Sequence, residues 1–397
     1  MQHAPSLDRQ NVSLPRRQSR SAMVSGDAAE RSISPALRLA TLFGSERTER
    51  IAQAVQCLMT RIGATLDLQH LSASLARAGT IGRIGVPRAA ATLMYAQCVM
   101  LGNSFGATPL APVTRLWRGL QRRADVLLDV RQSLTMPGSA AALAGMHRDV
   151  LLVSHRVVER AVVPSPDDAH HADQWTRARE AAEIVHRVAA TEARDLLLVL
   201  PVGRSTLTHK LFTDAIERHA RLHRLPAPRT VKAGLLAALL SGESGGPRAV
   251  VASVMPIDDL SALATEAIGD TGPWPVMSLG RNVAFYDIPA DLHDGDMARS
   301  MLLVMASMLA RNGQAAHAHA LLQSLHVTST AAARMREELG GVLRVPADAI
   351  LSGVLANWGR VDSAEEAGAG GTGNRVYRRV LDPSFGRDRV ELLRDVG

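Results

Sequence analysis

The most informative segment of this sequence for its architecture is residues 175–210, which read WTRAREAAEIVHRVAATEARDLLLVLPVGRSTLTHK. Its first part carries an apolar stripe at helical spacing, and residues 195–200 (DLLLVL) form a continuous apolar run, as expected of a strand buried on both faces. Pro201 and Gly203 break this strand, and a second helix follows to about residue 222. Helix, strand, glycine turn and helix predict an α/β fold whose turn aims backbone N–H groups and a helix N-terminus at an anion.

Strands and helices keep alternating on both sides of this segment. The sequence predicts further strands at 149–153, 249–255 and 283–288, and further helices at 230–240, 258–269, 297–311 and 314–326. Such alternation is typical of a mainly parallel sheet flanked by helices. We therefore expect an α/β domain over residues 148–330.

The flanking regions have a different character. Residues 34–145 have helical patterns at 34–44, 46–62, 68–77, 87–100 and 111–134, which predict an N-terminal helical domain. Residues 1–33 are rich in arginine and serine and predict a disordered basic arm, while residues 331–397 predict a helical and flexible C-terminal tail.

The charge of the chain permits a phosphate-binding function. The formal net charge is +7, and lysine occurs only at Lys210 and Lys232, so 43 of the 45 basic residues are arginine. An arginine-rich composition has two explanations, a GC-rich genome or a surface that binds phosphate groups such as those of nucleic acid. Acidic residues scattered among the arginines weaken any single basic field.

Cysteine use and hydropathy bear on the compartment. Cys57 and Cys98 are the only cysteines, which argues against a disulfide framework and for an intracellular location, cytoplasmic or nuclear. No apolar run approaches the ~18–20 residues of a membrane span. The Arg- and Ser-rich arm leaves organelle targeting or a secreted-effector leader open as alternatives.

The segment around Gly203 resembles the first motor lobe of RecQ-type DEAD/DEAH helicases, over about residues 172–326. In that family an apolar strand ends in a Leu-Pro-Thr-Gly turn and a Gly-Lys-Ser/Thr phosphate loop; Pro201 and Gly203 match this pattern, and Val202 stands in place of the threonine. The residues at 249–260 (AVVASVMPIDDL) resemble the next strand and turn of the family. The phosphate-binding lysine is missing, which makes the predicted P-loop-like motif degenerate.

The resemblance implies a function and a site. We expect a helicase-like, nucleotide-binding or nucleic-acid-binding protein without efficient ATP hydrolysis, with ATP as the implied cofactor. The cofactor-binding residues would be Gly203, Arg204, Ser205, Thr206 and Lys210. The alternative is a non-catalytic effector or adaptor that binds a protein partner through the helical domain.

Other residues offer weaker starting points for chemistry. In a third hypothesis, an unfamiliar hydrolase or transferase takes its acids from strand ends, at Asp258, Asp259 and Asp287, where ligands of parallel sheets gather. Asp258 is more simply explained as a helix N-cap. No catalytic set is predicted, and the histidines lack the spacing of metal ligands. The histidine pairs and the motif fragments that we considered are His170 with His171, His317 with His319, a serine-protease-like Gly-Glu-Ser-Gly-Gly-Pro at 242–247, and an acyltransferase-like His147 with Asp149.

Overall fold

The structure is a computed structural model. It describes residues 37–43, 46–64, 66–71, 98–102, 121, 124–134, 149–156, 168–191, 195–201, 207–241, 248–268, 274–280, 284–289, 292–311, 314–338 and 345–358. The predicted basic arm at 1–33 and the part of the predicted C-terminal tail after residue 358 lie outside these ranges.

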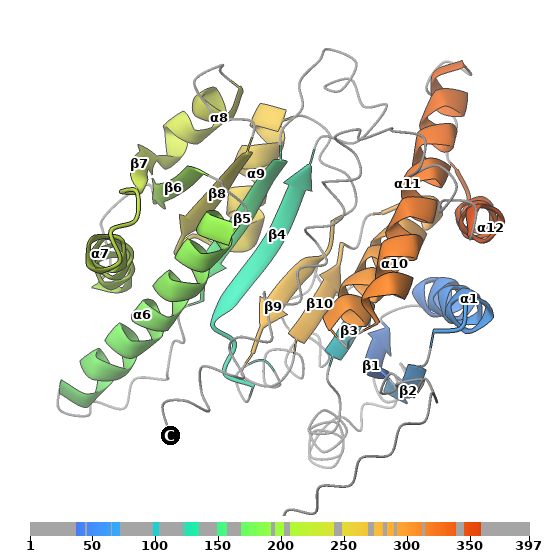
Figure 1. Ribbon diagram of the computed structural model, residues 1–397, viewed down its shortest axis with the longest axis horizontal. Helices are drawn as coiled ribbons and strands as arrows, with labels where there is room; N and C mark the ends of the chain where they lie inside the picture. Colours follow the sequence, from blue (N-terminus) through green and yellow to red (C-terminus); the bar gives the residue numbers. More distant parts are fainter. Residues whose placement is uncertain are drawn as a thin grey trace, which may run out of the picture. The chain divides into compact units, whose positions relative to one another are not determined.

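The described ranges contain strands and helices in alternation (Figure 1). The strands are β1 (Leu37–Phe43), β2 (Leu66–Leu71), β3 (Cys98–Gly102), β4 (Leu128–Leu134), β5 (Asp149–His155), β6 (Asp195–Leu200), β7 (Arg229–Lys232), β8 (Arg248–Ser253), β9 (Val276–Leu279) and β10 (Ala284–Ile288). The helices are α1 (Glu46–Arg61), α6 (Asp168–Thr191), α7 (Leu207–Leu222), α8 (Ala233–Ser241), α9 (Ile257–Ile268), α10 (Asp294–Arg311), α11 (Ala315–Glu338) and α12 (Ala347–Asn357).

All of these strands belong to one sheet, in the order β2-β1-β3-β10-β9-β4-β5-β8-β6-β7. Most described neighbours are parallel, but β9 is antiparallel to both β10 and β4, and β4 is antiparallel to β5. The α/β class is therefore confirmed, and the sheet is mixed. The strands near 195–200 and 249–255 are parallel neighbours, because β6 pairs with β8.

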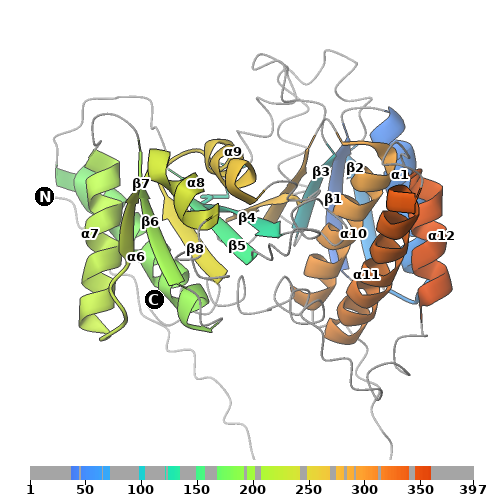
Figure 2. The same cartoon turned by 90° about the horizontal axis from the view of Figure 1, so that it is seen from above.

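The sheet has two halves that differ in their origin along the chain (Figures 1 and 2). We call one the central half, because β4 to β8 and α6 to α9 come from the middle of the sequence. We call the other the terminal half, because it combines β1, β2, β3 and α1 with β9, β10 and α10 to α12. The antiparallel strand β9 lies where the two halves meet.

The helical prediction for residues 34–145 fails at several described places. The segment 37–43 is strand β1 where a helix was expected, and β2, β3 and β4 also replace parts of predicted helices. The predicted helix after Ser45 is confirmed as α1, which ends in a left-handed Gly63 (φ 79°). The remaining residues of this region are outside the described ranges, so the domain boundaries stay a prediction, although the sheet contains strands from both sides of residue 148.

The central half packs its helices on two faces of the sheet. Alternate residues of β6 point to opposite sides, so Leu196 and Leu198 join a core with α6 and α7. Leu197 and Val199 join a second core with α8 and α9. Both cores exclude water from β6, which is why its sequence is a continuous apolar run.

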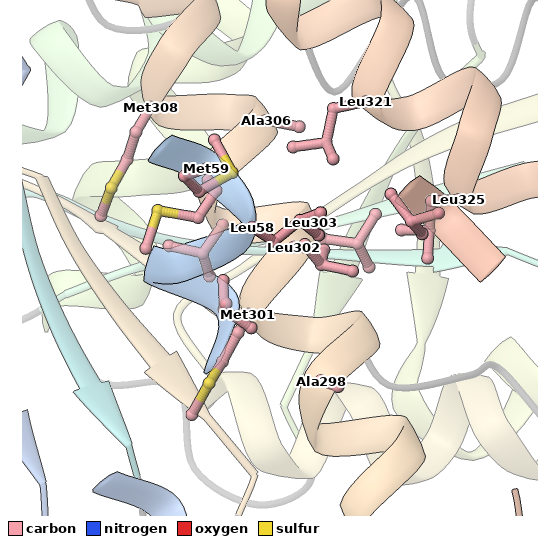
Figure 3. Close-up of a cluster of buried hydrophobic side chains, with 14 of the residues drawn as sticks. Leu58, Met59, Ala298, Met301, Leu302, Leu303, Ala306, Met308, Leu321 and Leu325 are labelled. Carbon is pink, nitrogen blue, oxygen red and sulfur yellow. The ribbon is translucent and has the colours of Figure 1, made fainter. Parts of the chain in front are cut away.

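The terminal half has a core of helices packed on β10. Figure 3 shows side chains of α1, α10 and α11 meeting in this core, with Leu302 among them. Buried methionines fill gaps between the leucines and alanines, as flexible side chains do in a core poor in aromatics. These are Met59, Met297, Met301, Met305 and Met308.

Candidate functional site

A row of polar side chains crosses the sheet where its two halves meet. In the register of β9, β4, β5 and β8, Ser278 lies opposite Asp129, Asp129 opposite Ser154, and Ser154 opposite Ser253. Residues paired in this way share one face of the sheet, and here it is the face that carries α8 and α9. The row also lies at the carboxyl ends of the parallel strands β5 and β8, where α/β proteins bind ligands.

Asp129 is the best-connected member of this row. The carboxyl is buried, at 5% exposure, and accepts a hydrogen bond from Ser278 Oγ at 2.5 Å. Arg156, which directly follows β5, donates to the other carboxyl oxygen through Nε at 2.9 Å and forms an ion pair through Nη2 at 2.8 Å. A fourth side chain, Gln121, accepts from Arg156 at 2.5 Å and approaches Ser278 at 3.4 Å. The network fixes the guanidinium and satisfies the buried carboxylate.

The two other serines of the row have structural bonds. Ser154 Oγ donates to the carbonyl of Met255 at 2.5 Å, and Ser253 Oγ donates to the carbonyl of Val199 at 2.9 Å. Both bonds tie a strand end to the backbone of an adjacent segment, and the bond of Ser154 reaches the segment between β8 and α9. Both hydroxyls are therefore engaged by backbone carbonyls, and the bond of Ser154 helps to position the start of α9.

Asp287, on β10, has an unusual environment. Its Oδ1 is out of contact with solvent and has no hydrogen-bond partner in the described ranges, although the residue keeps partial exposure. Burial, and after it the negative charges of Asp258 and Asp129, raise the pKa of Asp287 to about 7, against a smaller opposing effect of Arg156. A carboxylic acid with a pKa near 7 can both accept and donate a proton at neutral pH.

Asp258 completes the group from the first turn of α9, where it is exposed. An acidic residue there is stabilised by the helix dipole, which explains its place without any ligand. Its charge nevertheless reaches the Asp287 carboxyl. We call the set of Gln121, Asp129, Arg156, Asp258, Ser278 and Asp287 the boundary cluster.

The structure brings together only part of what the sequence suggested. Asp258 and Asp287, named as strand-end acids, lie in one electrostatic neighbourhood, whereas Asp259 is exposed on α9 and does not act on Asp287. Asp129, Arg156, Ser278 and Gln121 were missed. The signal for Asp129 was an alternating pattern in β4 (LDVRQSL), which we had read as the end of a helix.

The predicted anion-binding turn is only partly visible. Gly203, Arg204, Ser205 and Thr206 lie outside the described residues. Lys210 lies one turn into α7 with an exposed side chain. These five residues therefore stay a prediction.

The histidine pairs and the acyltransferase-like and protease-like fragments form no catalytic or metal-binding arrangement among the described residues. His317 stacks on Trp358, with ring centroids 6.4 Å apart, and His170 and His171 are in α6. Asp149 accepts a hydrogen bond from Gln132 at 3.2 Å, while His147 and 242–247 are outside the described ranges. In the part of the chain that the structure describes, no three histidine, cysteine or acidic side chains are arranged to hold a metal ion.

Comparison with known proteins gives the fold a reference. No protein-family model and no curated protein matches the chain. Among solved structures, the TT0538 protein from Thermus thermophilus matches with a TM-score of 0.64 and 18% identity, over 81% of this chain and 68% of that one. Isocitrate dehydrogenase from Methylococcus capsulatus matches with a TM-score of 0.62 and 14% identity, over 81% of this chain and 99% of that one. The chain shares the fold of isocitrate dehydrogenase.

This finding corrects the helicase resemblance. These two structural neighbours each match 81% of the chain and are not helicase lobes, and no helicase family matches. The helicase-like and P-loop-like interpretations of residues 172–326 are therefore wrong. The physical reason is that a helix, a buried strand, a glycine turn and a helix occur in any α/β sheet, and the diagnostic lysine was absent.

The sequence predicts no membrane span, and the helices of the structure can be compared with that prediction. Among the helices of the described ranges, none combines the length and the apolar character needed to cross a bilayer. The intracellular location and the partners stay predictions.

Proposed function

We propose that the chain binds a small hydroxyl- or amine-bearing molecule at the boundary cluster, and that Asp287 exchanges a proton with it. The observation that carries this proposal is the Asp287 carboxyl, with a pKa of about 7 and a buried Oδ1 that lacks a described partner. An unpaired buried carboxyl costs free energy, and such costs concentrate at functional sites. The shared fold with isocitrate dehydrogenase supports a small-molecule ligand.

The charge of the cluster selects the ligand. Arg156 is held by Asp129 and Gln121, so Asp258 and Asp287 leave an excess of negative charge. A hydroxyl or an ammonium group can donate a hydrogen bond to Asp287, whereas a molecule with several carboxylates would be repelled. For this reason we do not transfer isocitrate, which the neighbour's name implies as its substrate, to this chain.

Asp287→Asn should change how stability depends on pH. A carboxyl whose folded pKa is raised is protonated in the folded protein and ionised in the unfolded chain between about pH 4 and 7. Ionisation of this carboxyl in the unfolded chain therefore lowers the free energy of unfolding of the wild-type protein as pH rises from 4 towards 7. We expect the variant to be more stable than wild type at pH 8 by roughly 2–4 kcal/mol, and the advantage to vanish near pH 4, in urea unfolding at both pH values.

The same variant tests ligand binding. The probes are amino alcohols, polyols and hydroxy acids, measured by thermal shift at pH 6 and pH 8. A ligand that donates to ionised Asp287 should protect wild type more at pH 8 and lose about ten- to hundredfold in affinity with Asn. Asp259→Asn, exposed on α9, is the matched control and should bind like wild type. If these molecules raised the melting temperature of Asp287→Asn as much as that of wild type, with the same dependence on pH, the proposal would be refuted.

A second candidate function is nucleotide or nucleic-acid binding at the turn before α7. It is favoured by one specific observation: β6 and β8 are parallel neighbours, and β6 leads into α7, whose first turn exposes Lys210. A helix N-terminus after a parallel strand suits a phosphate group. The interaction-protein alternative gains no such observation, because most of its predicted groove at 34–145 is outside the described ranges.

Gly203→Val tests this second candidate. If ATP, ADP or a short oligonucleotide binds at the turn, the valine should abolish thermal protection by that ligand, because a side chain would occupy the space that the anion needs. Gly234→Val in α8 is the control, since nothing lies within 4 Å of a Cβ at that position. Protection that survives in Gly203→Val would place the phosphate site elsewhere.

A further inference from the structure

Helix α7 is held by histidine rings on two sides. From β5, buried His155 stacks on Phe212 of α7, with ring centroids 5.0 Å apart. From α6, buried His186 stacks on His219 of α7 at 5.1 Å, and His219 meets His223, just beyond the helix end, at 4.3 Å. Both contacts join α7 to the rest of the central half through rings that can take up a proton.

The hydrogen bonds of these rings suit their neutral forms. His186 Nε2 donates to the carbonyl of Ile216 at 2.9 Å, and His155 Nδ1 lies 3.3 Å from the carbonyl of Leu127. Each buried ring thus needs one proton, on the nitrogen that faces the carbonyl. A second proton would add a charge in an apolar core that contains Phe212 and Ile216.

The charges around the rings also oppose protonation. Burial lowers the pKa of His155 to about 4, with a further lowering by Arg177 on α6 and a partial compensation by the Leu127 carbonyl. Burial likewise lowers the pKa of His186 and His219, and His223 lowers both further. On α6, Arg179 lowers the pKa of His219 and Glu183 raises it, but Glu183 is already paired with Arg187 at 2.9 Å.

We propose that α7 is an acid-sensitive element, which detaches from α6 and β5 when these histidines become protonated. The direction follows from linkage. A histidine whose folded pKa is lowered stays neutral in the packed state, while the released state is protonated below about pH 6.5. Acidification from pH 7 through pH 5 therefore favours release of α7, and neutral pH favours the packed helix. The ring stack adds repulsion once more than one of its members is charged.

Hydrogen–deuterium exchange at pH 7.5 and pH 5.0, corrected for intrinsic exchange rates, tests this. The pKa of His155 is about 4 in the packed state and 6.5 when the ring is exposed. Protonation of this one ring should therefore raise the equilibrium constant for opening of α7 roughly 30-fold at pH 5.0 relative to pH 7.5. Peptides of α10, in the other half of the sheet, should change much less. Equal changes in α7 and α10 would mean global unfolding and would overturn the proposal.

Variants separate the rings from the fold. His155→Phe keeps the stack on Phe212 without a titratable group, and His219→Phe does the same beside His186. Combined with His186→Gln, which can still donate to Ile216, these changes should reduce the acid response while leaving exchange at pH 7.5 within a few-fold of wild type. The response that remains comes from His209, which is buried on α7 and whose pKa burial also lowers. A triple variant that responds to acid as wild type does would refute the role of these rings.

Discussion

Replacing Arg156 with methionine is expected to lower the free energy of unfolding by about 3 kcal/mol, because it leaves the buried Asp129 carboxylate without its cation. Removing one partner of a buried pair costs about 3–5 kcal/mol, and the partial exposure of Arg156 (33%) favours the lower end. Methionine retains much of the apolar stem, so packing changes little. Urea unfolding at pH 7 measures the effect.

The control is a double-mutant cycle with Asp129→Asn. Once the charge is gone, methionine at 156 should cost much less, because the amide can still accept from Ser278. We therefore expect the double variant to be more stable than Arg156→Met alone. A single variant within about 0.5 kcal/mol of wild type would show that the network contributes little to stability.

Leu302→Ala should also destabilise the protein strongly. Leu302 is fully buried on α10, in the core of α1, α10 and α11 that Figure 3 shows. Deleting a buried leucine side chain loses its transfer free energy and leaves a cavity, at about 2–5 kcal/mol, and here we expect about 3. The measurement is again the unfolding free energy in urea.

Leu235→Ala is the matched control for that change. Leu235 is 58% exposed on α8, so the same atoms are deleted from a helix without opening a cavity. Its effect should stay within about 0.5 kcal/mol. Similar losses for the two variants would contradict the position of Leu302 in the core.

Much of the central half could be predicted because its patterns are local, although β4 and β7 were assigned to helices. Strands β6 and β8 are buried on both faces and their sequences are continuous apolar runs, and the pattern of α7 is helical over its whole length. The strand β4 was missed because only alternate residues are apolar and the segment is short. Likewise β1 was assigned to a helix at 34–44 because Ser34 and Pro35 resemble a helix start, a local signal that the pairing with β2 and β3 overrides.

The residues of the candidate site also fall into those that local signals predict and those that depend on strand pairing. Asp258 and Asp287 were found from a local rule about strand ends, and the structure places their charges within mutual influence. The Asp129–Arg156 network could not be found, because it depends on the register of β4 with β5 and β9. The strand order of the sheet has the same origin, since nothing local predicts that β3 pairs with β10.

The pairing of β3 with β10 also constrains how the protein is made. Translation delivers Cys98–Gly102 early, but its partner Ala284–Ile288 emerges only after the whole of β4 to α9. Strand β3 therefore lacks its neighbour on one side until β10 is made, whereas β4 to β8 of the intervening segment are contiguous in the sheet. We therefore expect the long-range pairing of β3 with β10 to form late in folding.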